Sequence, residues 1–142
     1  MHAIVPAETE LDLRACHPVM LHLRPQLDDV DEFVSRVQRQ REAQQYHLAY
    51  IALDGAPQAL IGYRITENLS AGPHLYVDDL VTASEYRGRG LGRALMEWVT
   101  EEARRLGLST LHLDSGVQRH PAHRLYISHG MDIVFYHFRM QV

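Results

Sequence analysis

The segment Glu85–Arg93 reads EYRGRGLGR and places three glycines at alternate positions among arginines. An amphipathic helical pattern follows directly, so the segment is expected to lead into a helix N-terminus. Such a terminus presents unpaired N–H groups and a partial positive charge, and glycines allow an anion to approach those groups closely. The arginine side chains add full charges that can pair with phosphate. The segment therefore predicts a cradle for a phosphate or a pyrophosphate.

Two other phosphate-binding loops fit this spacing poorly. A Walker loop needs four residues between its glycines and then Gly-Lys-Ser or Gly-Lys-Thr, and the segment has neither feature. A dinucleotide loop needs Gly-x-Gly-x-x-Gly; Gly88 and Gly90 match its first two glycines, but Arg93 stands at the third. A tight turn with solvated arginines is the simpler interpretation, and the strong amphipathic helix that follows weighs against it.

Hydrophobic periodicity and turn signals indicate the elements that position this loop. The strand 74–82 (HLYVDDLVT) precedes it, and the helix 90–106 follows it. Gly62, inside another expected strand, indicates a bulge or a close backbone approach. Early hairpin connections and later helical crossovers imply a mixed sheet in an α/β or α+β domain. The other expected elements are one or two short helices within 8–23 that Pro18 interrupts, helices 28–44 and 122–129, and strands 2–5, 47–53, 59–66, 110–113 and 132–140.

Length and charge exclude several classes of protein. The 142 residues suffice for one domain with a sizeable core, which we expect to span residues 1–142. The formal net charge of −4 argues against a general nucleic-acid partner. No apolar run approaches the ~18 residues of a membrane span, and the N-terminus does not resemble a signal peptide. We therefore expect a cytoplasmic protein without a membrane partner.

The chain also contains ten histidines and a single cysteine. His112, Asp114, His120 and His123 have a spacing that could ligate zinc, but so many histidines in a short chain produce such spacings by chance, and we expect no metal. Cys16 lies next to a histidine in sequence, yet catalytic partners meet in space, so packing is the expected role. A lone cysteine forms no internal disulfide, which suits a reducing compartment.

Two motifs carry a family resemblance. Arg87-x-x-Gly90-x-Gly92 resembles the acyl-CoA loop, Arg/Gln-x-x-Gly-x-Gly/Ala, of the GNAT superfamily of N-acetyltransferases. Residues Ala122–Met131 (AHRLYISHGM) resemble the family's Ala-x-x-Leu-Tyr-x-x-x-Gly-Phe helix. The resemblance covers about residues 47–140. It implies the GNAT fold, a mixed and mostly antiparallel central sheet flanked by helices, and acetyl transfer from acetyl-CoA to an amine.

The resemblance also implies how acetyl-CoA is held. The loop's backbone N–H groups are expected to bind the pyrophosphate. The strand before the loop is expected to bind the pantetheine arm, with an N–H near Val81 polarising the thioester carbonyl. The implied cofactor-binding residues are Leu80, Val81, Thr82, Arg87, Gly88, Arg89, Gly90, Leu91, Gly92 and Arg93.

Tyr126 stands at the position of the family tyrosine that protonates the leaving thiolate. A tyrosine is protonated at neutral pH, so it can donate that proton. The alternative is a tyrosine that only packs the core. Two positions depart from the family pattern: Arg119 replaces an asparagine that often contacts the pantetheine arm, and Met131 replaces the final phenylalanine.

Asp78 and Asp79 are the candidate groups for taking a proton from the amine, although a water could relay it instead. Period-two alternation predicts that their side chains point to opposite faces of the sheet, so that one lines the acceptor site. The acidic pair resembles that of spermidine/spermine-type acetyltransferases, where it attracts a cationic polyamine. A polar strand end with solvated carboxylates is the simpler alternative.

These observations favour an enzyme that acetylates a small, cationic amine. Acetylation of a protein N-terminus or lysine is one alternative, and a CoA-binding sensor without turnover is another. Dimers are common in the family, and the apolar segment Asp132–Met140 is a candidate for pairing across two subunits of a homodimer.

Overall fold

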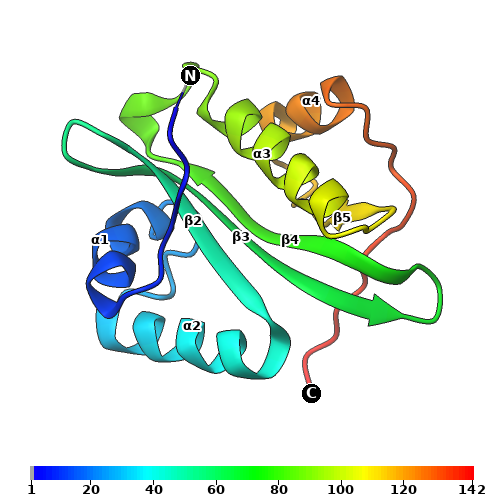
Figure 1. Ribbon diagram of the computed structural model, residues 1–142, viewed down its shortest axis with the longest axis horizontal. Helices are drawn as coiled ribbons and strands as arrows, with labels where there is room; N and C mark the ends of the chain where they lie inside the picture. The colour runs from blue at the N-terminus through cyan, green and yellow to red at the C-terminus, as the bar shows by residue number, and fades with distance from the viewer. Residues whose placement is uncertain (1) are drawn as a thin grey trace.

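The computed structural model describes residues 2–142, and Figure 1 shows the arrangement of their elements. Within these residues, five strands form one sheet in the order β1-β2-β3-β4-β5. Neighbouring strands run antiparallel from β1 to β4, whereas β5 runs parallel to β4. The expected mixed, mostly antiparallel sheet is confirmed. The strands are Val5–Pro6 (β1), Tyr46–Leu53 (β2), Ala56–Asn68 (β3), Gly72–Thr82 (β4) and Leu111–Leu113 (β5).

Helices cover both faces of the sheet. Figure 1 shows α1 and α2 on one side of it, with α3 and α4 on the other. Side chains of the strands accordingly pack into two buried cores, one on each face of the sheet, because alternate side chains point to opposite faces. Among residues 2–142, no helix combines the length and the apolar composition that crossing a bilayer requires. The helices are Glu10–Met20 (α1), Val30–Gln44 (α2), Leu91–Arg105 (α3) and His120–Ser128 (α4), with a 3-10 turn at Ser84–Tyr86 (η1).

Side-chain caps start the two N-terminal helices. Thr9 accepts a hydrogen bond from Asp12 N, and the Asp12 side chain accepts one from Thr9 N, which forms a reciprocal capping box at α1. Asp29 caps α2 in a similar way, by accepting from the backbone of its first turn. Pro18 does not interrupt α1 as expected, because it lies in the last turn and the helix ends two residues later, at Met20.

Strand β4 carries a bulge at Asp78. Gly62 of β3 lies opposite Asp79, whereas the next residue, Tyr63, lies opposite Val77. Asp78 is therefore an extra residue in β4. One extra residue reverses the alternation of side chains along a strand. Before the bulge, odd-numbered residues such as Leu75 and Val77 belong to the core beneath α3, whereas Val81, after it, belongs to the core beneath α1 and α2.

Gly62 is the position at which the backbone makes room for this bulge. Tyr46 Oη donates a hydrogen bond to Asp79 Oδ2 at 2.8 Å, directly above the glycine. A Cβ added at Gly62 would lie 1.9 Å from Tyr46 Oη and 2.9 Å from Asp79 Oδ2. Such contacts are impossible without moving a buried side chain. Gly62, where the sequence predicts a bulge or a close approach, therefore lies opposite a bulge of the neighbouring strand and under a close side chain.

The pairing between β4 and β5 is short. Leu75–Val77 pair with Leu111–Leu113, and the register ends there. In the described part of the chain, the edge of β4 from residue 78 to residue 82 therefore has no strand beside it on the β5 side. This part of β4 leads directly to the glycine-rich loop, so its open backbone groups lie next to the candidate site.

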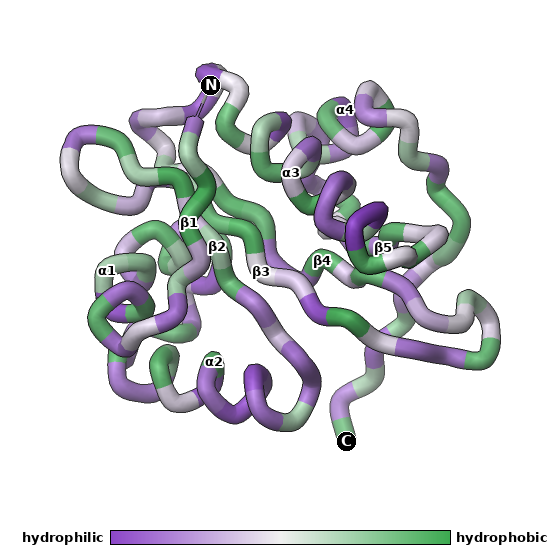
Figure 2. Tube along the Cα trace, in the orientation of Figure 1, coloured by the Kyte–Doolittle hydropathy of each residue, from purple (hydrophilic) through white to green (hydrophobic). Residues whose placement is uncertain are grey.

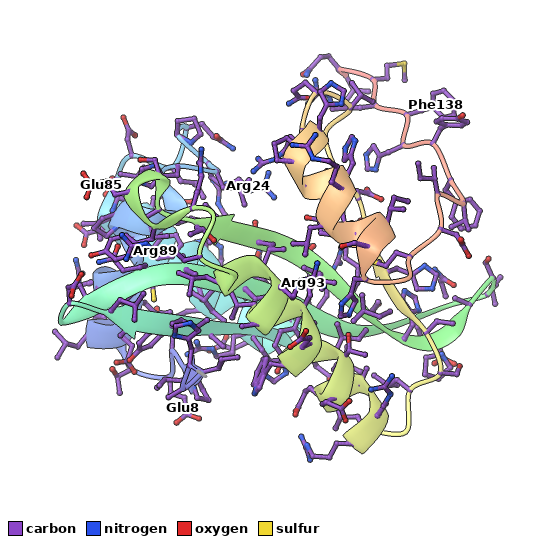
Figure 3. All side chains as sticks on the ribbon, turned by 90° about the horizontal axis from the view of Figure 1, so that it is seen from above. Glu8, Arg24, Glu85, Arg89, Arg93 and Phe138 are labelled. Carbon is purple, nitrogen blue, oxygen red and sulfur yellow. The ribbon has the colours of Figure 1, made fainter. Side chains whose placement is uncertain are left out.

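The expected strand 132–140 is wrong for this structure. Residues 131–142 follow α4 as an extended segment that joins no strand of the described sheet. His137 Nδ1 contacts Asp114 Oδ2 at 2.5 Å, so the segment passes the end of β5. Three residues of β5 offer too short an edge for a long ladder. Figure 2 shows hydrophobic residues along this segment, and Figure 3 shows Phe138 pointing away from the body of the molecule.

Candidate active site

The glycine-rich loop forms an open helix N-terminus. Gly88 and Gly90 have φ angles of +77° and +79°, in the left-handed region that favours glycine. Gly90 is the N-cap of α3 and has no side chain with which to cap it. The first intrahelical bond runs from Ala94 N to Gly90 O, so the N–H groups of residues 91–93 have no intrahelical acceptor. These groups can bind an anion, as the sequence predicts.

The loop arginines are exposed and leave the backbone accessible. Arg87 Nε donates to Thr82 O at 3.3 Å, which folds that side chain back over the end of β4. The Arg89 guanidinium stacks on the Tyr86 ring, 4.7 Å from its centroid. Arg93 donates to Ser128 at 3.0 Å, and Figure 3 shows it between α3 and α4. All three guanidinium groups therefore lie around the same helix terminus.

The loop and α4 meet in space although some thirty residues separate them in the chain. A Cβ at Gly92 would lie 3.2 Å from Leu125 Cδ2, so the third glycine allows α4 to pack closely against the first turn of α3. The Arg93–Ser128 hydrogen bond holds the same contact from a second point. The helix that carries Tyr126 is thus fixed beside the loop, and the two sequence motifs belong to one site.

Tyr126 is half-buried and packs at the edge of the core beneath α3. Burial raises the pKa of its hydroxyl above the usual value, and the nearby Arg119 opposes that shift. The phenol is therefore protonated at neutral pH and can donate a hydrogen bond or a proton. Arg119, the residue that replaces the family asparagine, is the N-cap of α4.

The register of β4 decides which backbone amides face the open edge. Ala83 N donates to Gln58 O at 2.8 Å, and the pairs Thr82–Ala59 and Val81–Leu60 continue this register. Hydrogen-bonded pairs alternate along an antiparallel ladder, so Val81 directs its N–H and C=O to β3. The amides of Leu80 and Thr82 point to the β5 side instead. The amides near Val81 that remain free for a ligand are therefore those of Leu80 and Thr82.

Asp79 is held by partners from two other elements. It accepts a hydrogen bond from Tyr46 at 2.8 Å, and Arg24 Nε donates to its other oxygen at 3.0 Å. A second contact, from Arg24 Nη2, is 2.9 Å long. Only 14% of the Asp79 side chain is exposed. With both oxygens engaged, this carboxylate acts as a structural anchor for the α1–α2 connection.

Asp78 has fewer partners than Asp79. Burial raises the pKa of its carboxyl to about 6, which Asp79 reinforces and Arg64 opposes. Arg64 Nε approaches Asp78 Oδ2 at 3.1 Å, but among the described residues neither atom has a well-aligned hydrogen bond. Oδ2 is buried while the side chain keeps 26% exposure, which leaves Oδ1 as the oxygen that a ligand can reach.

A pocket of about 270 Å³ opens beside both aspartates. The expected alternation of Asp78 and Asp79 to opposite faces is wrong, because the bulge at Asp78 brings both side chains to the α1–α2 face. Residues from α1, the α1–α2 connection, α2, β2 and β4 line the pocket: Met20, Arg24, Gln26, Leu27, Phe33, Arg36, Val37, Gln40, Tyr46, Asp78 and Asp79.

Sequence reasoning missed Arg24, Arg64 and Tyr46. Arg24 and Tyr46 meet Asp79 across sequence separations of 55 and 33 residues. Arg64 of β3 contacts Asp78 of β4, and that contact depends on the register shift that the bulge introduces between the two strands. Single arginines and tyrosines at such distances form no motif. The glycine at position 62 was the one available signal that an unusual contact lies above it.

The remaining candidate groups do not assemble into a second reactive centre. Among residues 2–142, no three His, Cys, Asp or Glu side chains come together as a metal-binding group. His123 contacts the Gly116 carbonyl at 2.8 Å, and Asp114 contacts His137. Cys16 is fully buried, and burial raises the pKa of its thiol to about 12. A thiol in that state is a poor nucleophile, so the structure supports a packing role.

Comparison with known proteins agrees with this geometry. The sequence model described as "Acetyltransferase (GNAT) family" matches residues 11–131, which include the loop, β4 and α4. The chain belongs to the GNAT family of acetyltransferases. The uncharacterized N-acetyltransferase YhdJ of Bacillus subtilis is 34% identical over 127 residues, which cover 89% of each chain. The GNAT chain described here is therefore an N-acetyltransferase.

Solved structures show the same GNAT fold at low sequence identity. An acetyltransferase of Trypanosoma brucei superposes with a TM-score of 0.81 at 20% identity, over the whole of both chains. AAC(6')-Iy, solved in complex with the bisubstrate analog CoA-S-monomethyl-acetylneamine, has a TM-score of 0.78 at 15% identity and 99% coverage of each chain. Members of the GNAT family use acetyl-CoA, and the open α3 terminus of this chain suits its diphosphate.

The anion site can be tested by a pair of substitutions at Gly90. Asn and Asp both tolerate a positive φ and both cap helices, so Gly90→Asn and Gly90→Asp differ mainly in charge. We expect Gly90→Asp to bind CoA at least about tenfold more weakly than Gly90→Asn, because its carboxylate repels the diphosphate. Calorimetric titration with CoA measures the difference. Equal affinities would show that the diphosphate is bound elsewhere.

Proposed function

We propose that this GNAT enzyme transfers the acetyl group of acetyl-CoA directly to the primary amine of a small molecule. The pocket beside Asp78 is the observation that carries this proposal. Its volume of about 270 Å³ lies below the ~300–1,000 Å³ typical of drug-sized ligand sites, so it suits a small acceptor. It adjoins the strand that leads into the loop, which lets an amine in it approach the open edge of β4.

The residues then have separate tasks. The N–H groups of the loop, from Arg87 to Arg93, hold the diphosphate of acetyl-CoA. The Leu80 and Thr82 amides bind its pantetheine arm and thioester along the edge of β4. Asp78 accepts the proton that the attacking amine must lose. Bound acetyl-CoA supplies the activated acetyl group: the amine nitrogen bonds to the carbonyl carbon as the carbon–sulfur bond breaks. Tyr126 gives its proton to the departing sulfur and later recovers one from solvent.

The charge of the acceptor needs a different argument from the one the sequence offered. The acidic pair predicts a cationic acceptor only if its carboxylates are available. Asp79 is engaged by Arg24, and Asp78 lies against Arg64 with Oδ1 still accessible, so the pair leaves one oxygen, which suits a single amine and not several ammonium groups. The acceptor that this site suits is therefore a small amine and not a polyamine.

Two other functions make different demands on this site. Acetylation of a protein N-terminus or lysine requires an extended groove for the peptide around the amine, whereas the described pocket is small. A sensor without turnover needs neither an acid nor a base, whereas the protonated Tyr126 and the raised pKa of Asp78 match those tasks. Product detection by mass spectrometry across a panel of amines separates all three functions.

The proton donor can be tested with Tyr126→Phe. This variant loses only the hydroxyl, so we expect unchanged CoA affinity and a turnover that falls several-fold, because the sulfur must leave without its proton donor. Tyr136→Phe is the control, since Tyr136 is 84% exposed on the C-terminal segment and phenylalanine keeps its aromatic ring on that face. Steady-state kinetics with a saturating amine measures both variants. Unchanged turnover in Tyr126→Phe would remove the role.

The base can be tested through the pH dependence of kcat/KM. A base acts when deprotonated, so kcat/KM should rise with pH through the carboxyl pKa of about 6 and then level off. Asp78→Asn should abolish this limb and lower the plateau by about 100-fold. Asp79→Asn, which changes the neighbouring carboxylate, should retain the limb. A limb that persists in Asp78→Asn would assign the proton to another group.

We infer that the enzyme is a homodimer joined through its C-terminal segment. Alternate residues of this segment would form one continuous apolar face if it became a strand, and these are Val134, Tyr136, Phe138, Met140 and Val142, each at least 65% exposed. Such a face needs a partner. The segment passes the end of β5, whose three residues are too short an edge to hold it, so the C-terminal segments of two copies would pair with each other and bury their apolar faces together.

Charge substitutions on the two faces of this segment test the dimer. Phe138→Asp places a carboxylate on the apolar face, and we expect it to give monomers, because burying an unpaired charge is unfavourable. Gln141→Asp adds the same charge on the opposite face and should remain dimeric. Light scattering during gel filtration measures the masses. A wild-type chain that is monomeric at high micromolar concentration would exclude the dimer.

A further inference from the structure

The acceptor pocket contains two guanidinium groups at its accessible surface. Arg24 reaches it from the α1–α2 connection and Arg36 from α2, with 38% and 48% of their side chains exposed. The carboxylates of the same pocket lie deeper, at 26% for Asp78 and 14% for Asp79. The guanidinium groups are therefore the most exposed charges among the residues that line the pocket.

Both arginines are held in place and still have N–H groups to offer. Arg24 donates from Nε to Asp79 and from Nη2 to the Asp78 carbonyl. Arg36 donates from Nε and Nη2 to the same oxygen of Glu32. A guanidinium has five N–H donors, so each side chain retains free donors in a fixed plane. Planar, anchored guanidinium groups suit recognition of a carboxylate.

Figure 3 shows how Arg24 lies relative to the rest of the site. In this view its side chain is drawn between the segment that carries Glu85 and helix α4. Because Arg24 contacts both aspartates of β4, its guanidinium stands a short distance from Asp78. An amine near Asp78 and an anionic group near the arginines can therefore belong to one small molecule.

The rest of the lining supports a short apolar part between these two ends. Met20, Leu27, Phe33 and Val37 contribute apolar surface, and the volume of about 270 Å³ limits the ligand to the size of an amino acid. A polyamine would place further ammonium groups beside the two guanidinium groups, where like charges repel. The charge and size of the pocket thus favour an acceptor with one amine and one anionic group over a polyamine.

We propose that the acceptor is a small zwitterionic amine, one that carries a carboxylate within a few bonds of the amino group, as amino acids do. Its amine faces Asp78, and its carboxylate binds to Arg24 and Arg36. This inference rests on the proposed function, because it names the class of acceptor for the same reaction.

Matched pairs of acceptors test the class. Each test acid is compared with the derivative in which the carboxyl group nearest the amine is converted to an amide. The acids are leucine, phenylalanine, glutamate and β-alanine, and spermidine is the polyamine for comparison. We expect kcat/KM to be at least about tenfold higher for the acids, because an amide forms no charge-assisted bond with the guanidinium groups. The amino groups of the amides are less basic and more often unprotonated, so intrinsic reactivity favours the opposite order.

Two arginine variants of α2 test whether Arg36 binds the carboxylate of the acceptor. Arg36→Gln should raise KM for the preferred acid about tenfold, with a similar kcat and an unchanged KM for its amide. Arg39→Gln is the control, because Arg39 also pairs with Glu32, at 3.1 Å, but lies outside the lining of the pocket. It should leave all constants unchanged. Equal effects of the two variants would assign the change to Glu32 and overturn the role of Arg36.

The outcomes separate this inference from the proposed function. Acetylation of the amides or of spermidine in preference to the acids overturns the zwitterionic class and leaves small-amine acetylation intact. CoA binding without transfer to any amine overturns the proposed function, and the acceptor class with it. Preference for the acids that Arg36→Gln abolishes supports both.

Discussion

The bulge in β4 is the constraint on which the site depends. A regular strand would place neighbouring carboxylates on opposite faces of the sheet, and one of them would enter the core beneath α3. The extra residue at Asp78 turns both carboxylates to the α1–α2 face. Gly62 permits this arrangement, because the Tyr46 hydroxyl occupies the space of its missing side chain and fixes Asp79. A single glycine in β3 thus supports the charge arrangement of the whole pocket.

In the proposed mechanism, strand β4 binds acetyl-CoA with its backbone and the acceptor amine with its side chains. Its backbone groups at residues 80 and 82 face the open edge beyond β5, while the side chains at residues 78 and 79 face the pocket under α1 and α2. The short β5 keeps that edge free for most of its length. The close packing of α4 on α3 at Gly92 then brings the tyrosine to the same end of the sheet. Three modest backbone features therefore define the geometry of the site.

The sequence was most informative where chemistry depends on local backbone. Glycines that must adopt positive φ, the helix that follows them and the tyrosine helix are short patterns, and the structure brings them together as predicted. The mixed sheet was also predicted, and Gly62 indicated an irregularity, which lies in the neighbouring strand at Asp78. The faces of the two aspartates were not predicted, because a bulge changes the phase of every later residue. Their arginine partners come from remote segments, which no local pattern can indicate. The final strand was predicted from its own residues, but a strand also needs a free edge of sufficient length.

The burial of Cys16 has a consequence for the chemistry of the product. Each turnover of an acetyl-CoA-dependent enzyme releases free CoA, whose thiol can form mixed disulfides with exposed cysteines of the same protein. Cys16 has 0% exposure, and burial keeps the pKa of its thiol near 12, so it is almost never a thiolate. Because it is the chain's single cysteine, the folded enzyme offers its own product no site for thiolation. Oxidative conditions that form mixed disulfides on other thiol proteins should therefore leave its native state without one.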